Sequence, residues 1–207
     1  MDMHGKPDVV DKRHLRSIKT KQKLLEAARE VFLEEGFQKG TISQMIKKAG
    51  IGYGTAYVHF EGKEEILMVL MDDVMEKFYE IAEVSFVPET KEEARQIILL
   101  QATAFLKMAE TERRMMQLFE QAIGISHSIS TKWRAIREKF IQRISKDIAF
   151  AQACGLARAE LNNSLVARGW FFTNEMYLWE IVRNEHQGTV EEIAQTMTAV
   201  YANGLYI

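Results

Sequence analysis

Proline is almost absent from this chain: only Pro7 and Pro88 occur in its 207 residues. Proline lacks a backbone N–H donor and its ring clashes with the preceding helical turn, so helix interiors tolerate it least of all residues. Long proline-free stretches therefore leave the chain free to form long helices. No strand-like alternation or hairpin turn competes with that interpretation. The sequence predicts an all-α fold.

Apolar residues recur at three- and four-residue spacings in segments separated by Gly, Pro and polar residues. Residues 1–19 lack this pattern and are interpreted as a flexible basic arm. Gly36 is expected to end the first helix, and the spacing of Thr189 and Glu192 is that of a capping box. Helices are predicted over residues 20–36, 41–49, 53–60, 63–85, 91–111, 113–124, 130–154, 164–184 and 189–206.

The net charge of −2 hides an asymmetry between the two ends of the chain. Residues 1–63 contain 12 Lys and Arg against 8 Asp and Glu, whereas residues 64–207 contain 15 against 21. A basic N-terminal part suits contact with phosphates. Because small imbalances of charge are common, the spacing of particular residues has to decide the function.

Several functional classes find no support in the sequence. Cys154 is the only cysteine, so no intrachain disulfide is possible. The N-terminus lacks the apolar core of a signal peptide, and no apolar run approaches the roughly 18 residues that cross a bilayer. No Glu-x-x-His pair, nucleotide-binding loop or serine elbow is present, and the five histidines are scattered. We expect a cytoplasmic protein without membrane contact, metal site, cofactor or enzymatic activity.

Residues 41–60 carry the strongest functional signal. Two short predicted helices are joined by a turn at residues 50–52, the arrangement of a helix-turn-helix, whose second helix lies in the major groove of DNA. On a helical wheel, Ala56 and Phe60 face inward with Ile51. The opposite arc has no carboxylate, and hydroxyls and an imidazole lie at its edges, which suits a polyanion. That arc comprises Gly54 and Val58, flanked by Thr55, His59 and Tyr57.

The motifs LLEAAREVFLEEGF (24–37), TISQMIKKAGI (41–51), GTAYVHF (54–60) and KEEIL (63–67) resemble the heads of the TetR family of bacterial repressors. The resemblance covers about 45 residues and includes polar positions that a purely structural helix would not require. It implies about nine helices, with a helix-turn-helix domain at 20–66 and a regulatory ligand-binding and dimerisation domain at 67–207. It further implies a homodimer built on the last two helices and a body cavity whose ligand releases DNA.

The resemblance also implies roles for individual residues. It assigns Thr55, Tyr57, His59 and Lys63 to phosphates, and it places Thr41 at the start of a helix whose amides face the DNA backbone. Tyr53, Gly54 and Val58 remain for the bases. The sequence departs from the family at three positions, with Ile46 for Ala, Ala56 for Leu and Gly52 for a Ser cap. The first two exchanges are opposite in size and are consistent with one compensated repacking.

The rest of the chain is rich in Met and aromatic residues, which suit an adaptable apolar pocket between helices, although any single one of them is more often an ordinary core residue. Arg134, Arg137 and Arg168 are candidates for holding an acidic head group, or simply surface residues. The predicted pocket comprises Met75, Phe78, Phe105, Met108, Phe119, Trp133, Phe140, Trp170 and Tyr177.

The last two predicted helices have apolar faces that a four-helix bundle across a two-fold axis would bury. Because one head contacts too little DNA for tight specific binding, a dimer is required. We expect a regulator of palindromic double-stranded DNA, a repressor released by a small apolar or amphipathic effector. The alternative is a DNA-binding protein of the same fold without an effector. The predicted dimer interface comprises Phe172, Met176, Trp179, Met197, Val200 and Tyr201.

Overall fold

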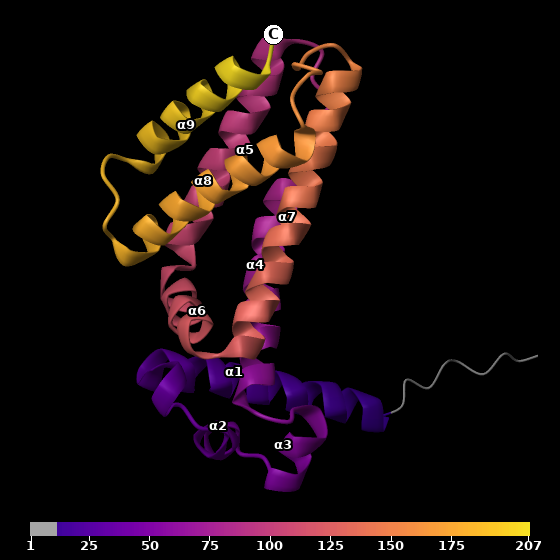
Figure 1. Cartoon of the computed structure of the whole chain (residues 1–207). Coiled ribbons are helices and arrows are strands. Elements are labelled where there is room, and N and C mark those ends of the chain that lie inside the picture. The colour runs from indigo at the N-terminus through magenta and orange to yellow at the C-terminus, as the bar shows by residue number, and fades with distance from the viewer. Residues whose placement is uncertain (1–11) are drawn as a thin grey trace, which may run out of the picture. The chain divides into compact units, whose positions relative to one another are not determined.

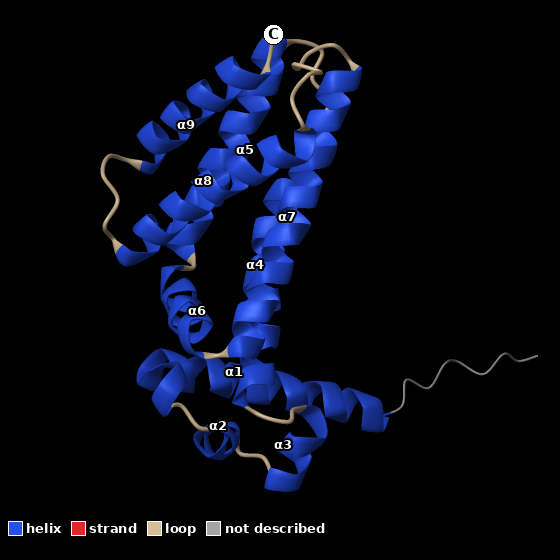
Figure 2. Ribbon diagram, viewed as in Figure 1, coloured by secondary structure: helices blue, strands red, loops and turns tan. Residues whose placement is uncertain are grey.

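The computed structural model describes residues 12–207, with side chains from residue 14 onward. Within that range the chain forms nine helices and no strand, which confirms the all-α prediction (Figures 1 and 2). The helices are α1 (Lys12–Lys39), α2 (Ile42–Ala49), α3 (Tyr53–His59), α4 (Lys63–Ala82), α5 (Lys91–Thr111), α6 (Arg113–Ile125), α7 (His127–Ala153), α8 (Asn163–Arg183) and α9 (Val190–Leu205).

The chain divides into two compact units between Leu70 and Met71, within α4. We refer to the first unit as the head and to the second as the body. The first eight residues of α4 therefore belong to the head and the remainder to the body. No helix in the described part of the chain is long and apolar enough to span a membrane.

Side-chain caps set where several helices begin. Thr189 and Glu192 form the predicted capping box, in which Thr189 accepts from the Glu192 amide and Glu192 accepts from the Thr189 amide at 2.7 Å. Helix α7 begins three residues earlier than the predicted residue 130. The side chain of Ser126 accepts a hydrogen bond from the Ile129 amide and so caps the helix at that point.

The start of α1 requires a correction. Residues 1–11 of the predicted arm lie outside the described residues, but residues 12–19 form the first turns of α1 rather than part of an arm. This stretch contains no glycine or proline to end a helix. Its apolar residues Leu15 and Ile18 are exposed, so the helix lacks the buried stripe on which the prediction depended. Near its other end, non-helical angles at Gly36 kink α1, and helical turns continue to Lys39.

The head is a small core formed by α1, α2 and α3 together with the start of α4. Helices α2 and α3 both pack against α1 and against each other. On the surface of the head, Lys48 of α2 is paired with Glu30 and Glu34 of α1 at 2.9 and 2.8 Å. The buried apolar side chains are Leu24, Ala27, Ala28, Val31, Phe32, Phe37, Met45, Ile46, Ala56, Phe60, Ile66, Leu67 and Leu70.

The body is held together by an aromatic cluster contributed by four helices. Tyr79 of α4 stacks on Phe140 of α7 with ring centroids 4.5 Å apart, and Phe78 meets Phe105 of α5 at 5.1 Å. Phe140 also stacks on Phe171 of α8 at 5.6 Å. Helix α8 packs on α5 and α7, while α9 packs mainly on α5. These contacts fix the walls around the space described below.

Candidate functional site

Helix α3 presents the arc that the wheel predicted. Ala56 and Phe60 are buried in the head, while Ile51 is half-buried beside them. Helix α3 itself contains no carboxylate, so no negative charge within it opposes a polyanion. The exposed residues are Tyr53, Gly54, Thr55, Tyr57 and Val58, and His59 is half-buried at the helix end.

The turn between α2 and α3 depends on glycine. Gly50 has φ 64° and ψ 36°, a left-handed conformation that ends α2, with its N–H bonded to the carbonyls of Ile46 and Lys47. Gly52 caps α3 from an extended conformation without a side-chain hydrogen bond. Ile46 and Ala56, which exchange a large and a small residue relative to the TetR pattern, are both fully buried. Their burial is consistent with a single repacked core.

Thr41 begins α2 in a capping box with Gln44. The Thr41 hydroxyl accepts from the Gln44 amide at 3.3 Å, and the Gln44 side chain accepts from the Thr41 amide at 2.8 Å. The Thr41 side chain is therefore engaged within the head. The first amides of a helix have no intrahelical acceptor, and in α2 these include the amides of Ile42 and Ser43.

The structure revises the role expected of Lys63. Its Nζ donates to the backbone carbonyls of Phe37, Gln38 and Gly40 at 2.8, 3.1 and 3.1 Å. It also lies 4.8 Å from the centroid of the Phe37 ring. An ammonium group has three hydrogens, and all three are used here. Lys63 thus fixes the segment after α1 to the start of α4.

Gly40 is a structural residue that the sequence analysis missed. A Cβ at this position would lie 2.9 Å from the Gly36 carbonyl oxygen and 3.3 Å from the Phe32 ring. The Gly40 amide donates to that same carbonyl at 3.0 Å, and the Gly40 carbonyl accepts from Lys63. The only available signal in the sequence was a glycine directly before the Thr41 cap. Gly40 and Lys63 together position Thr41 and hence α2.

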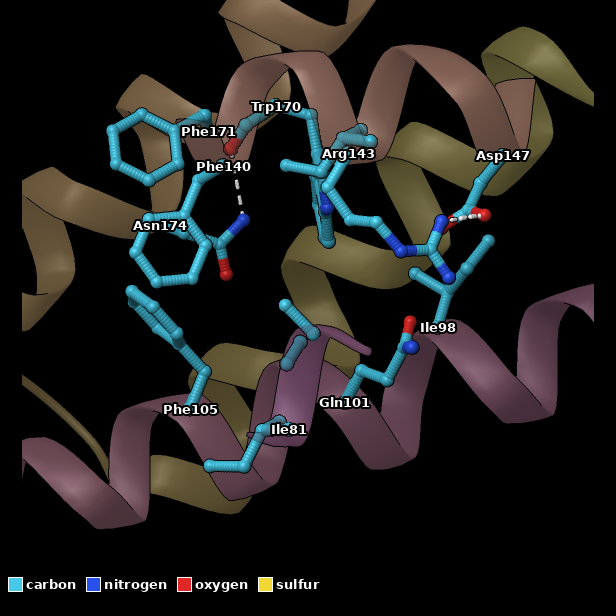
Figure 3. Close-up of a pocket in the computed structure, with 13 residues that line it drawn as sticks. Ile81, Ile98, Gln101, Phe105, Phe140, Arg143, Asp147, Trp170, Phe171 and Asn174 are labelled. Carbon is cyan, nitrogen blue, oxygen red and sulfur yellow. Dashed lines mark hydrogen bonds and ion pairs between the residues drawn. The ribbon is translucent and has the colours of Figure 1, made fainter. Parts of the chain in front are cut away.

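The body contains a cavity of about 70 Å³ for the centres of water-sized molecules (Figure 3). This is room for on the order of five waters, which is less than a drug-sized ligand requires. The walls come from α4, α5, α7 and α8. The lining residues are Ile81, Ala82, Ile98, Gln101, Ala102, Phe105, Phe140, Arg143, Ile144, Asp147, Trp170, Phe171 and Asn174.

Three of the nine predicted pocket residues line this cavity, namely Phe105, Phe140 and Trp170. Of the other six, Met75, Phe78, Phe119 and Trp133 are core side chains, with Phe78 behind Phe105. Met108 and Tyr177 are half-buried outside the lining. Residue type therefore predicted burial for four of these six side chains, but it did not distinguish residues that line the cavity from residues of the core.

The cavity has a polar end formed by Arg143 and Asp147 of α7. The Arg143 guanidinium is bonded to Asp147, lies 3.5 Å from Glu83 and donates to the Val84 carbonyl at 3.3 Å. Burial raises the pKa of the Asp147 carboxyl, and its hydrogen bond with Arg143 opposes that effect. Sequence reasoning missed this pair because its i, i+4 spacing is equally typical of a solvated helix surface.

The arginines considered for an acidic ligand lie elsewhere. Arg137 is paired with Glu175 at 2.7 Å, and Trp133 donates to the same buried carboxylate at 2.7 Å. Arg168 is paired with Glu138 at 2.8 Å, and Arg134 is exposed. None of the three arginines lines the cavity. Two of them have structural partners within the body.

The predicted interface residues on α8 and α9 fall into two groups. Phe172, Met176 and Val200 are exposed, Val200 to 73%. Trp179 is half-buried 5.3 Å from the Trp133 ring, and Tyr201 stacks on Trp170 with centroids 4.2 Å apart. Met197 requires a correction, because it is only 6% exposed and belongs to the core of its own chain.

The two short helices α2 and α3, their glycine turn and the separate helical body define a helix-turn-helix protein. Residues 24–69 match the family described as "Bacterial regulatory proteins, tetR family". The chain is 24% identical over 147 residues to an uncharacterized regulator, YvdT of Bacillus subtilis, covering 71% of this chain and 74% of that protein. Residues 24–69 therefore carry the DNA-binding domain of the TetR-family transcriptional regulators. These proteins are not enzymes.

Solved structures share the same fold. The Salmonella enterica GusR structure superposes with a TM-score of 0.72 at 16% identity, over 95% of this chain and 100% of that chain. The SmeT–triclosan complex superposes with a TM-score of 0.71 at 17% identity, over 91% of this chain and 92% of that chain. Identities this low establish a common architecture only.

Proposed function

We propose that the protein is a homodimeric repressor that binds a palindromic operator and is released from it by a small, largely apolar molecule. The observation that carries the DNA-binding part is the carboxylate-free, exposed face of α3. In this proposal Thr55, Tyr57 and His59 contact phosphates and Tyr53, Gly54 and Val58 face the bases, while the first amides of α2 after Thr41 bind the DNA backbone.

The exposed apolar strip on α8 and α9 supports dimerisation. Leu165, Phe172 and Met176 lie at spacings that share one face of α8, and Val200 is the corresponding exposed apolar residue of α9. Gly204 leaves open space beyond its backbone, which permits close approach of a second helix. Two copies joined through these faces would bury a strip that is otherwise exposed to water.

The body cavity supports regulation by a ligand. It is mainly aromatic and aliphatic, as small-molecule sites are. A structure of the same fold, SmeT, is known in complex with triclosan. Ile81 and Ala82 of α4 line the cavity, and the same helix begins at Lys63 in the head. A ligand that widened the cavity would act on a helix shared by both units.

A second candidate function has one observation in its favour. The cavity is small at about 70 Å³, which suits a DNA-binding protein that responds to no effector. The two functions differ in one measurable quantity, the operator affinity in the presence of a saturating cavity ligand. A ligand with equal affinity for the bound and the released conformations shifts nothing.

The DNA-binding proposal is tested with Gly54→Ala on an operator selected from random duplexes. A Cβ at Gly54 meets nothing in the head, and Ala is the better helix former, so we expect the head to gain up to ~1 kcal/mol of stability. Because this Cβ points outward from the proposed base-reading arc, operator affinity should fall at least about tenfold (~1.4 kcal/mol).

The control is Gly40→Ala, which should destabilise the head through its clash with the Gly36 carbonyl. Unfolding by urea and fluorescence anisotropy with the operator measure the two effects separately. A Gly54→Ala variant that is more stable and binds the operator as well as wild type would remove α3 from the interface. Failure to select any palindromic duplex would refute the operator itself.

A further inference from the structure

The polar groups of the body cavity differ from one side to another, and this difference affects which ligand the cavity accepts. Its walls are three phenyl rings, one indole and several aliphatic side chains. Gln101, Asn174, Arg143 and Asp147 are the polar members of the lining. Figure 3 shows them on different sides of one open space, with Arg143 and Asp147 joined at one end.

Asn174 presents an acceptor to this space. Its Nδ2 donates to the Trp170 carbonyl at 2.8 Å, which fixes the orientation of the amide. The side chain is only 6% exposed, and its oxygen is turned toward the space that Phe105 also faces (Figure 3). Across residues 12–207 no group donates to that oxygen. The oxygen is not one of the fully buried side-chain atoms that lack a partner, so part of its surface stays open and can accept a hydrogen bond from a ligand O–H or N–H.

The charged end of the cavity disfavours anions. Arg143 and Asp147 are the two ionisable side chains in the lining. The guanidinium is already shared between Asp147 and Glu83 and also donates to the Val84 carbonyl. One cation beside two carboxylates leaves this group with a net negative charge. A carboxylate ligand would therefore lose its hydration without gaining a free cation.

We propose that the cavity selects uncharged aromatic compounds that carry an O–H or N–H donor, with the Asn174 side-chain oxygen as the acceptor. The aromatic ring lies among Phe105, Phe140 and Trp170, and binding widens the space beyond its present volume. This inference rests on the proposed function in treating the cavity as a ligand site. It differs from the expectation of a ligand with an acidic head group, because Asp147 and Glu83 already neutralise the charge of Arg143 at the cavity.

The test uses three matched probes with the full-length protein at pH 7: 2-naphthol, naphthalene and 2-naphthoate. We expect saturable binding of 2-naphthol, about tenfold weaker binding of naphthalene, and no saturable binding of 2-naphthoate, measured by calorimetry. Binding of 2-naphthoate as tight as that of 2-naphthol would overturn the proposal. So would equal affinity for naphthalene and 2-naphthol.

Two variants locate the selectivity. Asn174→Leu keeps the size and apolar character of the position, so naphthalene should bind as before while 2-naphthol drops to the same affinity. Retained naphthalene binding shows that the cavity is still folded. Asp147→Asn leaves the Arg143 guanidinium beside one carboxylate, Glu83, in place of two, so 2-naphthoate binding should become detectable. Glu160→Gln makes the same change of charge on a residue outside the lining and should change neither affinity. Unaltered selectivity in Asn174→Leu would refute the assigned acceptor.

Operator binding in the presence of each probe separates this inference from the proposed function. If 2-naphthol binds with the expected selectivity and operator affinity does not change, the ligand class is upheld and effector-driven release is refuted. If 2-naphthoate releases the operator while 2-naphthol does not bind, release is upheld and the ligand class is overturned.

Discussion

Three backbone carbonyls accept hydrogen bonds from the single ammonium group of Lys63, all within 3.1 Å. They belong to residues 23 to 26 positions earlier in the chain. At the scale of the residue, this geometry changes what a lysine beside a DNA-binding motif is expected to do. Its charge stabilises the end of α1 and the start of α2, and we propose that its contribution to DNA binding is indirect.

Replacing Lys63 with Met removes the ammonium but keeps an unbranched side chain. We expect the head to lose roughly 1–3 kcal/mol of stability, because the partly buried hydrogen bonds to the Phe37 and Gly40 carbonyls lose their donor. The slope of log operator affinity against log salt should stay unchanged, since no phosphate contact is removed. Urea unfolding and salt titrations measure the two quantities, with Lys23→Met as a control at an exposed lysine of α1. A slope shallower by about one per head with unchanged stability would restore the phosphate assignment.

At the scale of the element, packing of α4 on α7 centres on Tyr79. Its ring stacks on Phe140 at 4.5 Å, and the Lys139 ammonium lies 3.4 Å from its centroid. Asp72 of α4 is also paired with Lys132 of α7 at 2.6 Å. Burial raises the pKa of Tyr79 to about 12, with smaller contributions from Asp72 and Glu76. We therefore expect the packing of these two helices to weaken at alkaline pH.

The sign of this effect follows from proton linkage. The folded pKa of Tyr79 lies above the unfolded value of about 10, so the folded state retains the proton more strongly. The contribution is complete below pH 10 and is lost as the pH rises through 12. Tyr79→Phe lacks this proton, so the difference in unfolding free energy between wild type and variant should shrink from pH 9 to pH 11. A difference that does not vary with pH in urea titrations would contradict the assignment.

At the scale of the whole molecule, the proposed dimer depends on which apolar residues remain outside the core. Val200 and Leu100 are 73% and 70% exposed, on α9 and α5. Val200→Glu should place an unpaired charge in the dimer interface and weaken association at least about tenfold, whereas Leu100→Glu should leave it unchanged. Sedimentation equilibrium measures both variants against wild type. Met197→Asp would not test the dimer interface, because Met197 lies in the core of its own chain and the variant would unfold.

Dissociation of both variants to the same extent would show that α9 is not the interface. A wild-type protein that is monomeric at micromolar concentration would remove the basis for palindromic recognition, since two half-sites need two heads.

The sequence by itself determined the features that arise from neighbouring residues. Helix periodicity, the Thr189–Glu192 capping box and the inward turn of Ala56 and Phe60 involve spacings of three or four residues, and the structure has them as predicted. The motif of the head was sufficient to indicate the family that the comparisons support.

Only the tertiary structure decided which residues of a given type are buried, exposed or line the cavity, because this depends on contacts between distant segments. Lys63 meets carbonyls of another helix end, and Met197 is buried where Val200 is exposed. Phe105 lines the cavity while Phe78 supports it from behind. Amphipathic periodicity indicates which face of a helix is buried, but a cavity lies where the side chains of several helices fail to fill the space between them. That outcome depends on packing across the whole body, which no local pattern in the sequence encodes.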